Sequence, residues 1–276
     1  MFGLEWAELI TTVIALALCG VVGGFLAGLL GIGGGMIFVP VFYYVFTVFF
    51  KVSPDVAMML AAGTSLTCMI PTSITAAIAQ YKRGNTNLET IKTWAPGMIL
   101  GVITGSLISS FYGGQWLAIL FGVVMILNAL NTFFRAKAKP MFDSLPGKFW
   151  QRVIGFLIAC FSVMLGIGGG TLTVPVLNAC SEEPHRSVGT SSAVSLFVCV
   201  PGAIILFATG TTPENAPVFT LGYVSFLAAV CVVPCSMFMA TFGVAIGKKI
   251  APATLKRIFA LALFCVAVRM LISGLS

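Results

Sequence analysis

The chain has 276 residues, of which 59% are hydrophobic and only 8% are charged, and its formal net charge is +7. Soluble domains carry about 25% charged residues, so this composition excludes a water-soluble globule and indicates a polytopic membrane protein. The positive charge does not indicate nucleic-acid binding, because the basic residues form short clusters between apolar segments, as the positive-inside rule predicts.

Ten apolar segments follow one another along the chain, five in each half. In order, they cover residues 9–30, 36–50, 55–80, 92–112, 115–135, 149–165, 171–180, 187–209, 219–246 and 252–273. As helices, segments 36–50 and 171–180 would extend for only about 22 Å and about 15 Å, which is less than the ~30 Å of the hydrocarbon layer. Each is therefore predicted to be the second arm of a re-entrant or broken-helix hairpin.

A glycine-rich sequence occurs twice, between the first two segments of each half. Residues 30–35 and residues 165–170 both have the sequence Leu-Gly-Ile-Gly-Gly-Gly, and Val-Pro follows each at the same spacing, at 39–40 and 174–175. This repeat indicates that the chain consists of two copies of one structural unit. Because glycine adopts backbone conformations that other residues avoid, both sequences are predicted to interrupt a helix.

The basic residues predict how the segments are oriented in the membrane. The 80–92 loop, the 135–152 linker and the 246–257 turn are rich in Lys and Arg, which places them in the cytoplasm. The 210–218 loop and the Gly113-Gly114 pair contain neither, which places them outside. The first hairpin then enters from outside, the second enters from the cytoplasm, and both termini lie outside. Inverted repeats of this kind are common in secondary transporters, which bind substrate at the repeat interface.

The expected fold is an all-α polytopic membrane protein made of two inverted repeats. Each repeat is a Gly-rich re-entrant or broken-helix hairpin plus three transmembrane helices. The first repeat is expected over residues 1–135 and the second over residues 151–276. A basic cytoplasmic linker over 136–150 joins them, and its prolines and glycine favour an irregular connection.

The two Gly-rich loops are the first candidate binding site. A helix end at such a break presents N–H groups and a partial positive charge to an anion, although glycines in membrane helices also serve close packing alone. A dinucleotide fingerprint is excluded, because Met36 and Thr171 occupy the positions where it requires glycine. The predicted substrate contacts in the loops are Gly33, Gly34, Gly35, Gly168, Gly169 and Gly170.

Polar side chains form the second set of candidates. Gly-Thr-Ser occurs at 63–65 and again at 189–191, near the start of the helix that follows each hairpin. These hydroxyls could donate to an oxyanion without burying a permanent charge, or could merely bond the preceding helical turn. Asn178 is a polar residue in an apolar arm, and Tyr43 occupies the equivalent place in the first half. The predicted substrate contacts in this set are Thr64, Ser65, Asn178, Thr190 and Ser191.

Several kinds of site are missing from the sequence. All eight acidic residues lie in loops or at segment ends, so no carboxylate is placed to form a proton relay inside the membrane. The eight cysteines form no metal or redox pattern and are interpreted as packing residues. His185 and Arg186, beside Glu182 and Glu183, are interpreted as a solvated turn rather than an anion-attracting vestibule. Without an ATP-binding, metal-binding or hydrolase motif, we expect no enzyme activity, cofactor or metal.

The paired motifs resemble those of the sulfite exporter TauE/SafE family, over nearly the whole chain. The matching elements are residues 28–35 with 39–40, 63–66, 81–84, 165–170 with 174–175, 188–191, 222–224 and 256–257. The resemblance implies a multi-pass transporter of the bacterial or archaeal plasma membrane. It further implies that the substrates are small anions that often contain sulfur, such as sulfite or organosulfonates; export is the favoured direction of transport, but the sequence does not determine it.

Residues and resemblance together predict a secondary transporter whose halves rock to give alternating access. Its partners would be a small anion and the lipid bilayer, and not nucleic acid. Two alternatives stay open: an anion channel that uses the same loops as its filter and, less favoured, a membrane-embedded enzyme or insertion factor. The sequence does not determine the particular anion, the coupling ion, or whether the chain forms a homo-oligomer.

Overall fold

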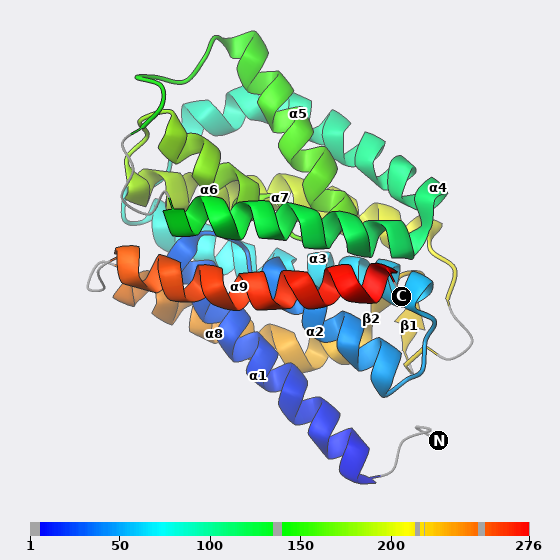
Figure 1. Ribbon diagram of the computed structural model, residues 1–276. Helices are drawn as coiled ribbons and strands as arrows, with labels where there is room; N and C mark the ends of the chain where they lie inside the picture. Colours follow the sequence, from blue (N-terminus) through cyan, green and yellow to red (C-terminus); the bar gives the residue numbers. More distant parts are fainter. Residues whose placement is uncertain (1–5, 135–139, 213–215, 218, 248–251, 276) are drawn as a thin grey trace.

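The computed structural model describes residues 6–134, 140–212, 216–217, 219–247 and 252–275. Within these ranges the fold is nearly all helical (Figure 1). Its elements are α1 (Trp6–Leu30), α2 (Gly35–Val48), α3 (Pro54–Tyr81), α4 (Leu88–Phe134), α5 (Lys148–Leu165), α6 (Gly170–Ala179), α7 (Pro184–Thr209), β1 (Thr220–Leu221), β2 (Val224–Ser225), α8 (Phe226–Ile246) and α9 (Pro252–Leu275). Seven helical stretches in these ranges are long and apolar enough to cross a membrane.

The helices follow the predicted apolar segments closely, with one displaced start. Segment 219–246 begins with an antiparallel hairpin in which β1 pairs with β2, and α8 starts only at Phe226. The reason is local: Phe219 and Gly222 have φ of 63° and 56°, which a right-handed helix does not accommodate. Ser225 then caps α8 by accepting a hydrogen bond from the N–H of Ala228 at 3.4 Å.

Part of the charge pattern used to predict the orientation is not among the described residues. This applies to residues 136–139 of the predicted linker, to Lys248 and Lys249, to Glu214, and to both chain ends. The orientation in the membrane and the repeat boundaries therefore stay predictions.

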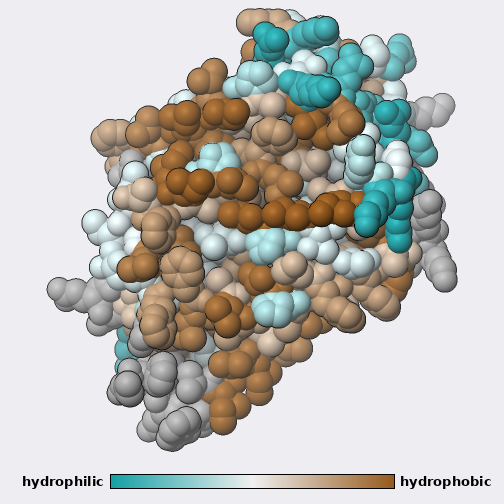
Figure 2. Space-filling view, turned by 180° about the vertical axis from the view of Figure 1, so that it is seen from behind, coloured by the Kyte–Doolittle hydropathy of each residue, from teal (hydrophilic) through white to brown (hydrophobic). Residues whose placement is uncertain are grey.

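The middle of the bundle is formed by α3 and α7, which pack against each other. Of the candidate spans, α3 is the most enclosed, with 78% of its apolar window buried. Around this pair, apolar side chains more than half exposed lie on several outer helices: Leu18, Leu100, Leu127, Val230 and Phe238. Figure 2 shows apolar residues over much of one face and hydrophilic residues gathered toward one end. Such a surface suits lipid and not water.

Rows of glycines allow two helix pairs to pack very closely. Helix α1 packs on α8, and the first half of α4 packs on α5. The glycines are Gly20, Gly24 and Gly28 on α1 and Gly97, Gly101 and Gly105 on α4. A Cβ on any of them would lie only 2.0–2.5 Å from a carbonyl oxygen of the facing helix. Close backbone approach through small residues is how helices associate in a membrane, where lipid removes the hydrophobic drive for helix pairing.

Helix α4 folds back on itself at Gly113, where φ is 75° and ψ is 171°. Its two halves run in opposite directions in Figure 1, and they correspond to the two segments predicted there. The turn is held from α3, because the Asp55 carboxylate accepts a hydrogen bond from the N–H of Gln115 at 2.9 Å. Asp55 thus caps the second half of α4 from a different helix.

Replacing Asp55 with alanine should therefore destabilise the fold by about 1 kcal/mol, the usual loss when a helix cap is removed. The expected observation is a lower midpoint of thermal unfolding in detergent micelles. Asp143→Ala, at an exposed position before α5, removes the same charge and should leave the midpoint unchanged. Equal midpoints for the two variants would show that the cap contributes nothing.

Candidate functional site

Both Gly-rich sequences interrupt the helical path. Helix α1 ends at Leu30 and α2 begins at Gly35, while α5 ends at Leu165 and α6 begins at Gly170. Three glycines in each break have φ between 68° and 84°: Gly31, Gly33 and Gly34 in the first, and Gly166, Gly168 and Gly169 in the second. This left-handed conformation is open to glycine and strains other residues.

The two breaks, far apart in sequence, touch each other. A Cβ on Gly35 would lie 2.7 Å from the Cα of Ile167, and a Cβ on Gly170 would lie 2.3 Å from the carbonyl oxygen of Gly31. The contacts are reciprocal, since the last glycine of each break lies against the first residues of the other. We call this region the loop junction, formed by residues 31–35 and 166–170.

Two serines hold the loop junction together. The Ser65 hydroxyl on α3 donates a hydrogen bond to the carbonyl of Gly166 at 2.8 Å. The Ser191 hydroxyl on α7 donates to the carbonyl of Gly31, also at 2.8 Å. Both serines are fully buried, so each half of the chain supplies the donor for the broken backbone of the other half. In this structure these hydroxyl protons are engaged by protein rather than free for a ligand.

The threonines of the same motifs have a different partner. The backbone N–H of Ser225, just before α8, donates to Thr64 Oγ1 at 2.9 Å. The N–H of Asn87, just before α4, donates to Thr190 Oγ1 at the same distance. Each threonine therefore fixes the start of a helix that packs beside it.

The glycines of the motifs make room for this arrangement. A Cβ on Gly63 would lie 2.1 Å from the carbonyl oxygen of Tyr223, and one on Gly189 would lie 2.0 Å from that of Asn85. The three residues of Gly-Thr-Ser thus have three separate tasks: close approach of a connecting segment, anchoring of that segment, and bonding to the opposite loop. The sequence repeat pointed to the motif, but not to this division of tasks.

The side chain of Met69 fills the space between the two loops. A Cβ on Gly33 or Gly168 would lie 2.2 Å or 2.3 Å from the Met69 methyl carbon. Met69 is completely buried. Its counterpart in the second half, related to it as Ser191 is to Ser65, is Ser195. Met69 therefore occupies the junction from one half only.

Two buried hydroxyls beside the loop junction have no hydrogen-bond partner. Ser73 Oγ on α3 and Ser162 Oγ on α5 are both enclosed and unpaired. They lie 3.8 Å and 3.9 Å from the positions that a Cβ would take on Gly33 and Gly169. Leaving a buried hydroxyl unpaired costs about 1–3 kcal/mol. No motif in the sequence singled out these serines, because one serine in an apolar helix carries no distinctive pattern.

Asn178 does not share the position of the other predicted contacts. It lies near the end of α6, eight residues after Gly170 and hence about 12 Å farther along the helix. Its side-chain oxygen is buried without a partner. Tyr43, the equivalent residue of the first half, hydrogen-bonds through its hydroxyl to Ser273 Oγ at 2.9 Å.

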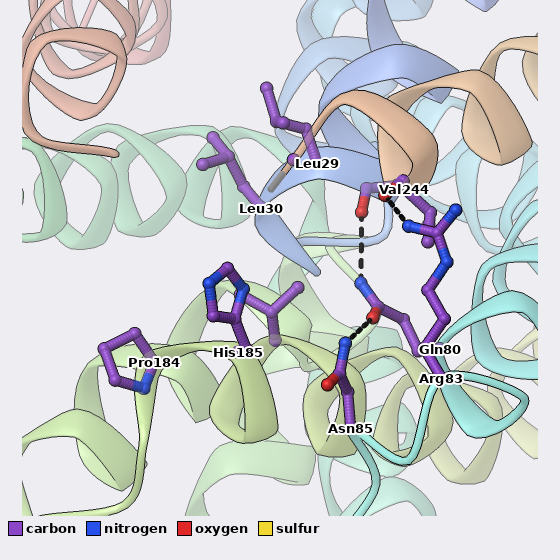
Figure 3. Close-up of a pocket in the computed structure, with 11 residues that line it drawn as sticks. Leu29, Leu30, Gln80, Arg83, Asn85, Pro184, His185 and Val244 are labelled. Carbon is purple, nitrogen blue, oxygen red and sulfur yellow. Dashed lines mark hydrogen bonds between the residues drawn. The ribbon is translucent and has the colours of Figure 1, made fainter. Parts of the chain in front are cut away.

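A hollow that is partly open to solvent lies beside the first loop (Figure 3). Gln80 Nε2 donates to the Gly28 carbonyl at 3.5 Å, and Asn85 Nδ2 donates to Gln80 Oε1 at 2.8 Å. Arg83 Nη1 donates to the carbonyl of Val244. His185, interpreted above as part of a solvated turn, lines this hollow.

Comparisons with known proteins agree with a membrane transporter. The family model described as Sulfite exporter TauE/SafE matches residues 16–270. A probable membrane transporter protein of Haemophilus influenzae is 28% identical over 94% of this chain and 98% of its own length. The probable membrane transporter protein YunE of Bacillus subtilis is 25% identical over 95% and 98%. An archaeal protein of Methanocaldococcus jannaschii, also named a probable membrane transporter protein, is 29% identical over 87% and 88%.

Replacing Ser65 or Ser191 with alanine should destabilise the protein by about 1–3 kcal/mol each, because a loop carbonyl then loses its buried donor. Thermal unfolding in detergent measures the effect. Ser109→Ala is the matched control, since this buried serine donates to the backbone carbonyl of Ser106 in its own helix, and the substitution should destabilise the protein less. If all three variants have the same midpoint of thermal unfolding as the wild type, Ser65 and Ser191 do not stabilise the junction.

Proposed function

We propose that the chain, which belongs to the sulfite exporter TauE/SafE family, is a secondary transporter of a small sulfur-containing anion. Sulfite or an organosulfonate would cross the plasma membrane of a bacterium or archaeon, in the direction of export. The observation that carries this proposal is the loop junction, where two helix breaks meet beside buried hydroxyls that lack a protein partner.

The two halves are proposed to be inverted repeats related by a pseudo-two-fold axis. Support comes from the helix pairs that pack together: α1 with α8 and α5 with the first half of α4, α3 with α7, and the second half of α4 with α9. Exchanging the halves turns the α1–α8 pair into the pair of α5 with the first half of α4, and it returns each of the other two pairs to itself. The reciprocal hydrogen bonds of Ser65 and Ser191 obey the same exchange. In transporters with this symmetry the substrate binds between the repeats.

The loop junction suits an anion for electrostatic reasons. Helices α2 and α6 both start there, and their N-cap residues, Gly34 and Gly169, provide no side-chain cap. The first N–H groups of a helix lack partners within it, and the helix dipole adds a partial positive charge at this end. Two such ends, with the Ser73 and Ser162 hydroxyls, would bind an oxyanion without a fixed cation, so the anion can leave again.

Met69 must move before an anion can enter, because its methyl group fills the space between Gly33 and Gly168. The structure therefore corresponds, in this proposal, to a closed state with the site occupied by protein. An unbranched, flexible thioether side chain is well suited to move aside.

Met69→Ile should slow anion transport on the order of tenfold, since a β-branched side chain of similar volume is stiff at χ1 and swings aside with difficulty. Transport by purified protein in liposomes measures the effect, and thermal unfolding shows whether the variant is folded. Met58→Ile, at another fully buried methionine of α3, is the control. A wild-type rate for Met69→Ile would show that the side chain does not gate the site.

The proposed function is tested by following labelled sulfite and organosulfonates into liposomes that contain the purified protein. Gly34→Val and Gly169→Val should abolish the flux, because both positions need a positive φ and an added Cβ would press on Phe38 or Val198 and so displace the loop. Gly147→Val, at a position with φ of −54° and open space around its Cα, should transport normally.

Three outcomes would contradict the proposal. A wild-type protein that moves no sulfur oxyanion or sulfonate is not the proposed transporter. Undiminished flux through inserted, folded Gly34→Val and Gly169→Val variants removes the loops from the transport path. Electrical currents far above the turnover of a transporter would indicate a channel instead.

A further inference from the structure

The hollow in Figure 3 lies where the ends of four helices converge. Leu30 is at the end of α1, Gln80 is near the end of α3, His185 is at the start of α7, and Val244 is near the end of α8. Arg83 reaches it from the turn after α3. Among the described residues that line the hollow, Arg83 and His185 are the groups that can carry charge, and neither is acidic.

The hollow is separated from the loop junction by a single layer of contacts. Leu30 and Val188 both line it, and Gly31 of the junction directly follows Leu30. The Val188 carbonyl, 2.9 Å from Ser191 Oγ, shares the single proton of that hydroxyl with the Gly31 carbonyl at 2.8 Å. Only Leu30, Val188 and the hydrogen bonds of Ser191 would therefore separate an ion in the hollow from the loop junction.

The helix ends around the hollow do not repel an anion. The carbonyl ends of α1, α3 and α8 carry partial negative charge, but Gln80 donates to Gly28 on α1, Arg83 donates to Val244 on α8, and the N–H groups of Arg83 and Asn85 donate to the Gln80 carbonyl at the end of α3. The start of α7, at His185, adds partial positive charge.

Two carboxylates directly precede the lining residue Pro184: Glu183, which is exposed, and Glu182, which is paired by its own contacts. Glu182 lies just before α7, and its Oε1 is 3.4 Å from Arg186 Nε. The same oxygen accepts a hydrogen bond from Asn87 Nδ2 at 3.1 Å. Arg83 lines the hollow and uses one of the five N–H donors of its guanidinium on Val244, so four donors and the full charge are left for a ligand.

We propose that this hollow is a second anion site: a vestibule in which Arg83 binds the substrate oxyanion before it passes Ser191 into the loop junction. The proposal rests on the proposed function, since it assigns the same anion to both sites. The basic residues near 80–92 predict that the vestibule opens to the cytoplasm, where an exporter takes up its substrate.

The first test is the salt dependence of sulfite transport in liposomes. Raising the ionic strength from about 0.01 M to about 0.15 M shortens the Debye length from ~30 Å to ~8 Å, so Vmax/KM of the wild type should fall. Arg83→Gln should lower Vmax/KM about tenfold at low salt and remove most of the salt dependence. Arg83→Lys keeps the positive charge and should keep the salt dependence of Vmax/KM. A purely structural role of the arginine would not explain that result.

Lys82→Gln is the matched control, because Lys82 is an exposed neighbour that does not line the hollow. It changes the net charge equally and should transport as the wild type does. Equal salt dependence in Arg83→Gln and wild type, or equal losses in Lys82→Gln and Arg83→Gln, would overturn the vestibule.

The second test separates the vestibule from the junction by equilibrium dialysis of labelled sulfite. The Gly34→Val/Gly169→Val protein, whose junction is blocked, should still bind sulfite, and adding Arg83→Gln should abolish that binding. The vestibule proposal is overturned if the Gly34→Val/Gly169→Val protein binds no sulfite, or if it binds the same amount with and without Arg83→Gln. Either result leaves the loop junction open as the transport site. If the wild-type protein transports no sulfite but still binds it in a way that depends on Arg83, the proposed transport function is wrong and the anion site in the hollow is supported.

Discussion

The structure depends on two reciprocal hydrogen bonds, from Ser65 to the Gly166 carbonyl and from Ser191 to the Gly31 carbonyl. A helix that breaks inside an apolar bundle exposes peptide groups that water cannot reach, and irregular backbone at membrane depth is tolerated only where protein or a polar cavity satisfies it. Here each half satisfies the break of the other. Each loop needs a donor from the other half, so the two halves must fold against each other to form the junction.

The same requirement explains why polar groups are concentrated near one place. Thr64 and Thr190 fix the connections that lead into α8 and α4, and Gly63 and Gly189 leave space for those connections to approach. The side chains of both Gly-Thr-Ser motifs are therefore engaged by protein. Ser73 and Ser162 beside the junction are not, and an unpaired hydroxyl beside a rigid scaffold is a natural place for a ligand that comes and goes.

Helix positions, the two breaks and the fold-back at Gly113 could be predicted from the sequence, because apolar length and glycine placement are local properties. The hairpin before α8 was missed, since Phe219 and Ser225 continue an apolar segment and only backbone angles reveal the turn. The sequence also singled out Gly-Thr-Ser but could not show whether its hydroxyls face a ligand or the opposite loop. The roles of Met69, Ser73 and Arg83 could not be predicted, because they depend on contacts with residues distant in sequence, such as that of Met69 with Gly168.

The central claim is that the two loops jointly bind an anion. The most direct measurement is a crystal structure of the protein soaked with selenite, a sulfite analogue whose selenium can be located by anomalous scattering. The account predicts a selenium peak between Gly33 and Gly168, with the Met69 side chain displaced and the Ser73 hydroxyl within hydrogen-bond distance. Selenium found only elsewhere, with Met69 still filling the junction in protein that transports selenite, would contradict it.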